Sequence, residues 1–485
     1  MNRKIIVNIL GILLILEALF MMPAALVSLY KHEHGVFTAF IISMALSFVA
    51  GFTMWWMTKD RKNKFYSREG FVIVGIGWIL ASMVGALPFA ITGQIPHYLD
   101  ALFEVISGFT TTGASILTEV ESMSKGLLFW RSFTHWLGGM GMLVFLLAVV
   151  PMGKGGGYST YLLQAESPGP SVGKLVPKMR KTAMILYTIY IVLTILDAVL
   201  LIGGGMSLFD GLCTAFGTAG TGGFGVKNDS IAGFSPYIQT VTTIFMLLFG
   251  VNFSLYFLLI AGRAKEAIKS QELHTYILLF VASVVMITVN ILPQYGMHVM
   301  SSLHDAAFAV STVMTTTGYS TADFASWPEF SRSILLVLMV VGSMAGSTGG
   351  GIKVIRFLII MKVMNARLKH AIHPHSISLA RVDDRTITGT TVQWIYFFMS
   401  AYAVIVVVSF IFISLDNFSM ETNISAVIAC LNNIGPGFGV VGPTGNYAAF
   451  SYPSKIVLML DMLIGRLEIF PILLLLYPGT WKKAG

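Results

Sequence analysis

The chain has 485 residues, of which 55% are hydrophobic and only 11% are charged, and its formal net charge is +8. Soluble domains carry about 25% charged residues, so most of this chain is expected to face lipid. The composition excludes a cytosolic enzyme and a disordered chain, and two cysteines exclude a disulfide framework. The basic residues lie in connections between apolar segments and form no basic domain, so we expect no nucleic-acid partner.

Ten apolar segments are long enough to cross a bilayer as helices. They lie near residues 5–29, 36–57, 71–92, 127–151, 182–203, 238–262, 273–292, 330–362, 391–413 and 454–478. An even number of spans places both termini on one side of the bilayer. If that side is the cytoplasm, 24 of the 31 Lys and Arg residues are cytoplasmic and six are outside. This bias predicts a multi-pass membrane protein with both termini cytoplasmic.

Four outside connections contain a second, shorter apolar segment, and these four segments resemble one another. In each, an acidic residue precedes a glycine by 13 or 14 residues: Asp100 and Gly113, Asp210 and Gly223, Asp305 and Gly318, Glu421 and Gly435. We expect the acid to be the N-cap of a helix too short to cross the bilayer. A unit of span, short helix, glycine loop and span thus occurs four times. The predicted division is two N-terminal transmembrane helices at 1–68 and pore repeats at 69–153, 180–262, 271–385 and 386–485.

A short helix that ends at membrane depth leaves non-helical backbone, which protein or water must surround. Four such loops around one axis direct carbonyl and hydroxyl oxygens, and the negative ends of four helices, toward a common centre. That arrangement attracts a cation and replaces its hydration shell. The sequence therefore predicts an all-α integral membrane protein in which four pseudo-symmetric helix–pore loop–helix repeats surround one central cation pathway.

The glycine loops read TTTGAS (Thr110–Ser115), GTGGFG (Gly220–Gly225), TTTGYST (Thr315–Thr321) and LNNIGPGFG (Leu431–Gly439). These motifs resemble the Trk/Ktr/HKT superfamily of potassium transporters, and the chain is most similar to the bacterial TrkH/TrkG-type membrane subunits. WLGGMG (Trp136–Gly141), GSMAGSTGGGIKVIR (Gly342–Arg356) and GRLEIFP (Gly465–Pro471) extend the resemblance over nearly the whole chain.

The resemblance implies potassium uptake across the bacterial cytoplasmic membrane, with potassium as the substrate and no other cofactor. It also implies a homodimer with one pore in each protomer. A cytosolic TrkA-type nucleotide-binding subunit is the implied regulator, and the basic segments Lys353–Arg385 and Lys174–Lys181 are candidates to dock it.

Carried over by position, the resemblance implies a potassium filter of four strands. The strands are Thr110, Thr111, Thr112 and Gly113; Gly220, Thr221, Gly222 and Gly223; Thr315, Thr316, Thr317 and Gly318; and Asn432, Asn433, Ile434 and Gly435. Sodium-carrying relatives often have serine at the first filter glycine, so Gly113 favours potassium. The second and fourth strands depart from the threonine-rich pattern, so we expect strict four-fold symmetry to be lost. A sodium-permeable or sodium-coupled transporter of the same fold is the alternative.

The eighth apolar segment contains four glycines within six residues, which destabilise a helix interior by about 1 kcal/mol each. The candidate gate residues there are Gly346, Ser347, Thr348, Gly349, Gly350 and Gly351. The alternative is close helix packing through small residues.

Two charged residues within apolar segments, Arg466 and Glu104, are candidates for a function, because idle charge at membrane depth is costly. The resemblance implies that Arg466 projects into the pore as an electrostatic barrier, and a local ion pair with Asp461 or Glu468 is the alternative. Glu104, in the first short helix, is a candidate to brace the filter. The apolar segments offer no acid–base pair of the kind an intramembrane enzyme needs, so we expect a transporter.

Overall fold

The computed structural model describes residues 2–59, 67–141, 179–375, 379–383 and 385–482. Within these ranges the chain is almost entirely helical, and its strands are β1 (Arg381–Val382) and β2 (Arg385–Thr386), which pair as a short antiparallel hairpin. The prediction of an all-α fold is confirmed. The repeat boundary at residue 153 and the basic residues 174–178 lie outside the described ranges.

Two leading helices, α1 (Arg3–Tyr30) and α2 (His34–Met57), form an antiparallel pair. Their backbones approach closely because Gly11 faces Gly51, and a Cβ on Gly11 would lie 2.7 Å from the carbonyl oxygen of Gly51. The Ser47 hydroxyl also donates to the carbonyl of Leu14 across the pair, at 2.8 Å. Small residues at such a crossing allow tight packing without a hydrophobic driving force.

Four units follow, each with a first helix, a short helix and a second helix. The first helices are α3 (Ser67–Gly85), continued by α4 (Leu87–Ile91), then α9 (Met179–Gly203), α14 (Gln271–Ile291) and α18 (Gly389–Ile413). The short helices are α5 (Tyr98–Phe109), α10 (Leu208–Gly220), α15 (Val299–Met314) and α19 (Met420–Leu431). The second helices begin with α6 (Lys125–Gly139), α11 (Pro236–Phe249), α16 (Glu329–Val341) and α20 (Tyr452–Arg466).

Three second helices resume after an interruption, as α12 (Phe253–Ile260), α17 (Val354–Ile372) and α21 (Phe470–Leu476). The remaining elements are short: α13 (Ala264–Ile268), η1 (Leu292–Tyr295), η2 (Phe324–Ser326), η3 (Ser414–Asp416), η4 (Gly439–Val441) and η5 (Pro478–Thr480). Among the described residues, six helices are long and apolar enough to cross a membrane, or up to seven if α11 and α12 count as one span. The count of ten spans stays a prediction.

Two of the predicted spans, 238–262 and 454–478, contain an interruption that the sequence analysis did not anticipate. A bend of 89° separates α11 from α12, where Gly250 ends one helix and the Asn252 side chain caps the next. Glu468 and Ile469 adopt positive φ between α20 and α21. Sequence reasoning anticipated an interruption only in 330–362, where the glycines are concentrated.

The acidic residues of the repeat are not the N-caps that their spacing predicted. Ser207 and Ser419 cap α10 and α19 through their hydroxyls, and α5 begins at Tyr98, so Asp100 lies inside its first turn. Asp305 lies two turns into α15, because that helix begins at Val299. Three of the four acids still lie in the first turn, where the positive end of the helix dipole favours them.

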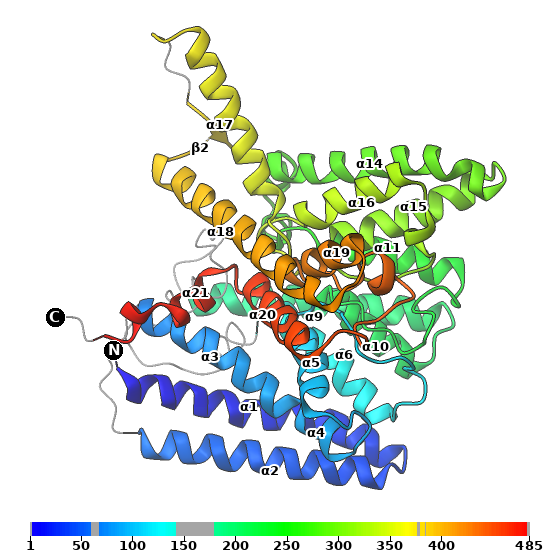
Figure 1. The fold of residues 1–485 in the computed structure, drawn as a ribbon, viewed down its shortest axis with the longest axis vertical. Coiled ribbons are helices and arrows are strands. Elements are labelled where there is room, and N and C mark those ends of the chain that lie inside the picture. The colour runs from blue at the N-terminus through cyan, green and yellow to red at the C-terminus, as the bar shows by residue number, and fades with distance from the viewer. Residues whose placement is uncertain (1, 60–66, 142–178, 376–378, 384, 483–485) are drawn as a thin grey trace.

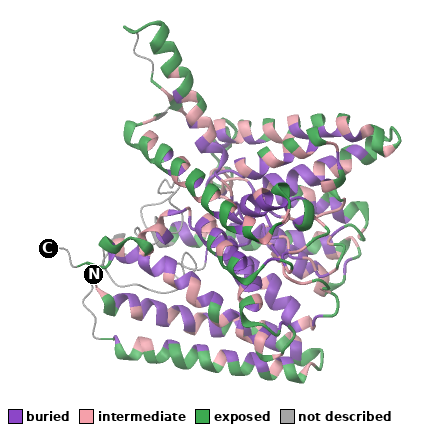
Figure 2. Ribbon diagram, viewed as in Figure 1, coloured by how far each residue is buried: buried purple, intermediate pink, exposed green. Residues whose placement is uncertain are grey.

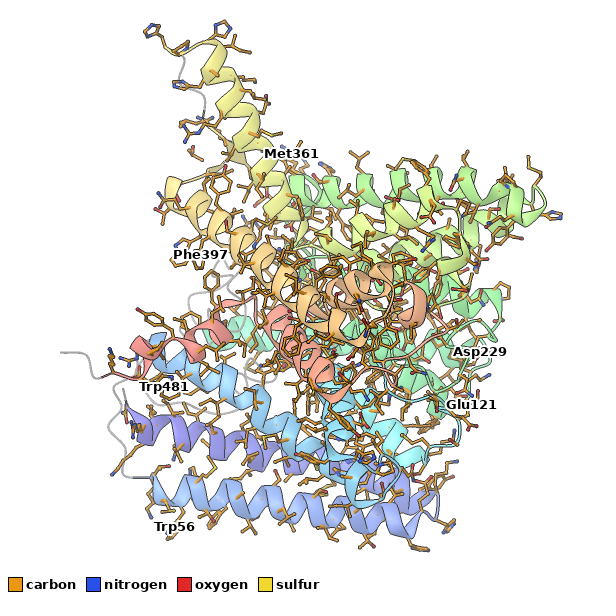
Figure 3. The ribbon with its side chains drawn as sticks, viewed as in Figure 1. Trp56, Glu121, Asp229, Met361, Phe397 and Trp481 are labelled. Carbon is orange, nitrogen blue, oxygen red and sulfur yellow. The ribbon has the colours of Figure 1, made fainter. Side chains whose placement is uncertain are left out.

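Both chain termini lie at one end of the molecule (Figure 1), as an even number of spans predicts. Trp56 and Trp481 lie at that same end, and Glu121 and Asp229 lie at the opposite end (Figure 3). Buried residues concentrate where the short helices meet the second helices, whereas α2, α18 and the far end of α17 are largely exposed (Figure 2). The core of the molecule is therefore the region where the four units converge.

Candidate functional site

The four glycine loops share one backbone conformation. We name them pore loops 1 to 4, comprising residues 110–113, 220–223, 315–318 and 432–435. The second residue of each loop is left-handed, with φ of 54° at Thr111, 55° at Thr221, 59° at Thr316 and 55° at Asn433. The third residue of each loop donates its N–H to the carbonyl five residues earlier, at 2.8 Å in all four loops. This is a Schellman end to the short helix, built on threonine or asparagine in place of the usual glycine.

The fourth residue of each loop is a glycine with positive φ, namely Gly113, Gly223, Gly318 and Gly435. A Cβ added to any of them would lie no more than 2.6 Å from a carbonyl oxygen of the next loop. The partners run in order: Gly113 faces Gly222, Gly223 faces Thr317, Gly318 faces Ile434, and Gly435 faces Thr112. The four loops therefore form a closed ring, and glycine is required both by φ and by the neighbouring carbonyl.

The four ring glycines line one cavity, whose lining also includes Val120 and Asn228. Each short helix ends at the ring, so four helix C-termini direct their negative partial charge toward it. Carbonyl oxygens, hydroxyl oxygens and four negative helix ends are the ligands and the field that suit a monovalent cation.

The side chains of the ring are less symmetric than its backbone. Loops 1 and 3 each contain a pair of threonine hydroxyls 2.8 Å apart, formed by Thr110 with Thr112 and by Thr315 with Thr317. In loop 4, Asn433 donates to the Thr112 hydroxyl at 3.0 Å and so joins the fourth loop to the first. Loop 2 has glycine at both of the corresponding positions. Loops 1 and 3 thus share one side-chain pattern, and loops 2 and 4 each depart from it in a different way.

A buried ion pair supports loops 1 and 2 from behind. The Arg131 Nε donates to Glu104 at 2.6 Å, and Glu104 also accepts from the Ser115 hydroxyl and the Ile116 N–H. A second guanidinium nitrogen of Arg131 donates to the carbonyl of Gly225 at 3.0 Å. Glu104 therefore binds the two residues Ser115 and Ile116, just after pore loop 1, and its role as a brace of the filter stays a prediction. Its partner Arg131, on α6, was not singled out from the sequence.

Two tyrosines missed by sequence reasoning also hold the loops. The Tyr447 hydroxyl donates to the carbonyl of Gly435 at 2.6 Å, directly on the ring. The Tyr319 hydroxyl, next to Gly318, donates to the carbonyl of Thr214 at 3.0 Å in α10. The sequence gives little sign of the Tyr319 contact, because the partner residue Thr214 belongs to a different unit.

The predicted gate residues lie on the interruption between α16 and α17, which we name the break segment (residues 342–353). Gly342, Gly346, Gly351 and Lys353 all have positive φ there. The Gly350 N–H donates to the Thr316 hydroxyl at 2.6 Å, so the break segment touches pore loop 3. On its other side, Met344 N–H donates to the Gly250 carbonyl and Phe253 N–H donates to the Gly346 carbonyl. Gly346 is exposed and Ser347 is half-buried, whereas Thr348, Gly349 and Gly350 are buried.

Arg466 joins the break segment to two other units. Its guanidinium donates to the carbonyls of Thr348 at 2.7 Å and Gly139 at 2.6 Å, and also to that of Gly138. The two acids considered as local partners have other bonds: Asp461 accepts from the Ser409 hydroxyl, and Glu468 pairs with Arg356. Arg466 therefore binds backbone at the ends of α6 and the break segment, which are points where second helices stop.

The chain is similar to proteins of known family along nearly its whole length. A family model described as TrkH, cation transport protein, matches residues 36–479. The Trk system potassium uptake protein TrkH of Salmonella typhimurium is 36% identical over 493 residues, covering 100% of both chains. The Trk system potassium uptake protein TrkG of Escherichia coli is 31% identical over 486 residues, covering 99% of both.

The fold agrees with a solved structure. The crystal structure of the potassium transporter TrkH from Vibrio parahaemolyticus matches with a TM-score of 0.89 and 32% identity, covering 99% of this chain and 100% of that one. Sequence and fold relatives thus span the same residues as the repeats described above. The chain belongs to the TrkH family of cation transport proteins.

Proposed function

We propose that this protein is a channel-like potassium uptake subunit of the bacterial cytoplasmic membrane. The closed ring of four pore loops is the observation that carries the proposal, because each loop meets the next through one glycine and one carbonyl. Relatives over the full length are named potassium uptake proteins. The membrane potential drives a cation inward by about 2.3 kcal/mol per charge per 100 mV, which needs no nucleotide site in this chain.

The break segment is the proposed gate, with Arg466 as its anchor. The segment lies against Thr316 of the ring at Gly350 and carries four residues with positive φ. Arg466 holds it through the Thr348 carbonyl while binding the end of α6. A movement that breaks the hydrogen bonds of Arg466 frees the break segment and moves the Arg466 charge away from it. The steric barrier and the electrostatic barrier are then removed together.

The proposed orientation places both termini in the cytoplasm, with the cavity at the ring facing outside. On that view, α17 and the β1–β2 hairpin carry exposed basic residues toward a cytosolic TrkA-type subunit, among them Lys369 and Arg381. Lys353 and Arg356 are only 6% and 4% exposed. These two belong to the gate, so the docking surface is narrower than the segment Lys353–Arg385 that the sequence indicated. A homodimer with one pore in each protomer completes the proposal.

Growth of a bacterium that lacks potassium uptake tests the proposal. We expect the wild-type chain, expressed with a matching regulatory subunit, to restore growth at low potassium. Gly113→Ser places a Cβ against the Gly222 carbonyl at a positive φ, so it is expected to weaken rescue or admit sodium. Gly203→Ser is the matched control, since a Cβ there meets nothing within 4 Å.

The outcomes separate the competing assignments. Failure of the wild type, despite confirmed membrane expression, contradicts potassium uptake. Rescue that Gly113→Ser leaves unchanged contradicts the filter assignment and keeps the transporter. Uptake by the wild type that requires sodium supports the alternative of a sodium-coupled or sodium-permeable transporter of the same fold.

A further inference from the structure

Pore loop 2 lacks the side chains that support its neighbours. Loops 1 and 3 are each tied by a threonine hydroxyl pair between the first and third loop residues. Loop 2 has Gly220 and Gly222 at those two positions. A glycine-rich strand has the largest conformational entropy to lose on ordering, so this loop needs support from outside itself.

The missing volume is filled by His135, which projects from α6. A Cβ on Gly222 would lie within 2.5 Å of three atoms of the His135 imidazole, namely Nδ1, Cγ and Cε1. A Cβ on Gly220 would overlap the carbonyl oxygen of His135. The His135 side chain is 0% exposed. The imidazole thus occupies the place where the side chain of residue 222 would be.

His135 also stacks on the residue that follows the ring glycine of loop 2. The imidazole lies on the ring of Phe224, with 4.1 Å between centroids and 20° between planes. Arg131 lies one helical turn before His135, and its guanidinium is 3.5 Å from the Phe224 ring centroid. Phe224 is therefore held between two side chains of α6, and Glu104 fixes Arg131 by their ion pair.

His135 contacts pore loop 2 through van der Waals packing and ring stacking. Neither ring nitrogen has a hydrogen-bond partner among the described residues. The other second helices carry a methionine in their last turns: Met246 in α11, Met339 in α16 and Met462 in α20. All three methionines are fully buried. Histidine thus occurs in the helix that packs against the one loop with glycine at its third position.

We propose that His135 is a positioning residue that sets the potassium-over-sodium discrimination of the ring. Its imidazole replaces the side chain that Gly222 lacks and, with Arg131, holds Phe224, so that the carbonyls of loop 2 match those of the other three loops. The inference rests on the proposed potassium function. Coordination by the carbonyls of all four loops decides which ion replaces its hydration shell favourably, so a loosened loop 2 lowers discrimination.

An exchange of side chains between the two positions tests the proposal. His135→Ala opens the space beside Gly222 and is expected to lower the ratio of potassium to sodium uptake by about tenfold, or about 1.4 kcal/mol. Gly222→Thr alone collides with the imidazole and is expected to abolish uptake. The double variant gives loop 2 the residue found at Thr112 and Thr317, in the space His135 leaves, and is expected to recover much of the wild-type ratio.

The uptake ratio is measured in proteoliposomes with each purified variant, alongside thermal unfolding, and exposed His274→Ala serves as the control. Wild-type discrimination in His135→Ala overturns the proposal, and so does a double variant no better than Gly222→Thr. If His135→Ala fails to fold, rescue of folding and discrimination by Gly222→Thr supports the role, and failure of that rescue overturns it. Absence of potassium uptake by the wild type contradicts the proposed function itself.

Discussion

At the scale of single residues, the ring depends on a left-handed backbone conformation that residues other than glycine rarely adopt. Thr111, Thr221, Thr316 and Asn433 are left-handed although they are not glycines. A left-handed residue with a Cβ is strained, so the surrounding contacts must hold it. Those contacts come from other units, as the bond from Asn433 to the Thr112 hydroxyl illustrates. The ring is therefore stable only when all four units are assembled.

The ion pair between Glu104 and Arg131 is the clearest test of that support. We expect Glu104→Gln to lower stability by about 3–5 kcal/mol, because it leaves the guanidinium buried without its carboxylate. Thermal unfolding in detergent measures the change, and Glu121→Gln, at the surface, is the control. An unfolding temperature equal to wild type would show that the pair does not support loops 1 and 2.

At the scale of elements, three of the four second helices, α11, α16 and α20, are interrupted near the ring and then resume, and this was only partly foreseeable. Gly342 to Gly351 are concentrated enough to predict an interruption from sequence. The breaks at Gly250 and after Arg466 carry one glycine each, which an apolar helix tolerates. The Asn252 cap of α12 is local, but the Gly250 carbonyl accepts from the Met344 N–H, which belongs to another unit. Partners from another unit leave no local signal.

Arg466 tests whether these interruptions form a gate. Hydrogen bonds from a charged group contribute about 1.5–3 kcal/mol each, and Arg466 makes three to backbone carbonyls. We expect Arg466→Ala to raise rubidium flux into proteoliposomes by about tenfold or more in the absence of a regulatory subunit. Exposed Arg263→Ala is the control. Unchanged or lower flux would contradict a barrier at this position.

At the scale of the whole molecule, the spacing of the repeats indicated where the four loops lie along the chain. It did not indicate which side chains support them. The acid-to-glycine spacing located all four loops, and the structure gives each the same left-handed residue and glycine. The spacing could not reveal Arg131, His135 or Tyr319, because each contacts a residue of another unit that is far from it in sequence. Their signals lie in contacts between units, which a repeat within one chain does not encode.

The proposed orientation is tested by cysteine labelling. Cys213 and Cys430 are both buried, so the wild-type chain is an unlabelled background. In intact cells, we expect an impermeant maleimide to label Asp229→Cys, at the end opposite the termini, and to spare Lys369→Cys until the membrane is permeabilised. Labelling in the reverse pattern would invert the proposed topology.

The measurement that tests the central claim most directly is anomalous diffraction from crystals of this protein grown with rubidium in place of potassium. The account predicts an anomalous peak on the axis of the ring, among the carbonyls of Thr112, Gly222, Thr317 and Ile434. Peaks elsewhere in the protein with none at the ring, in crystals with rubidium at saturating concentration, would contradict the assignment of the four pore loops as the ion-binding site.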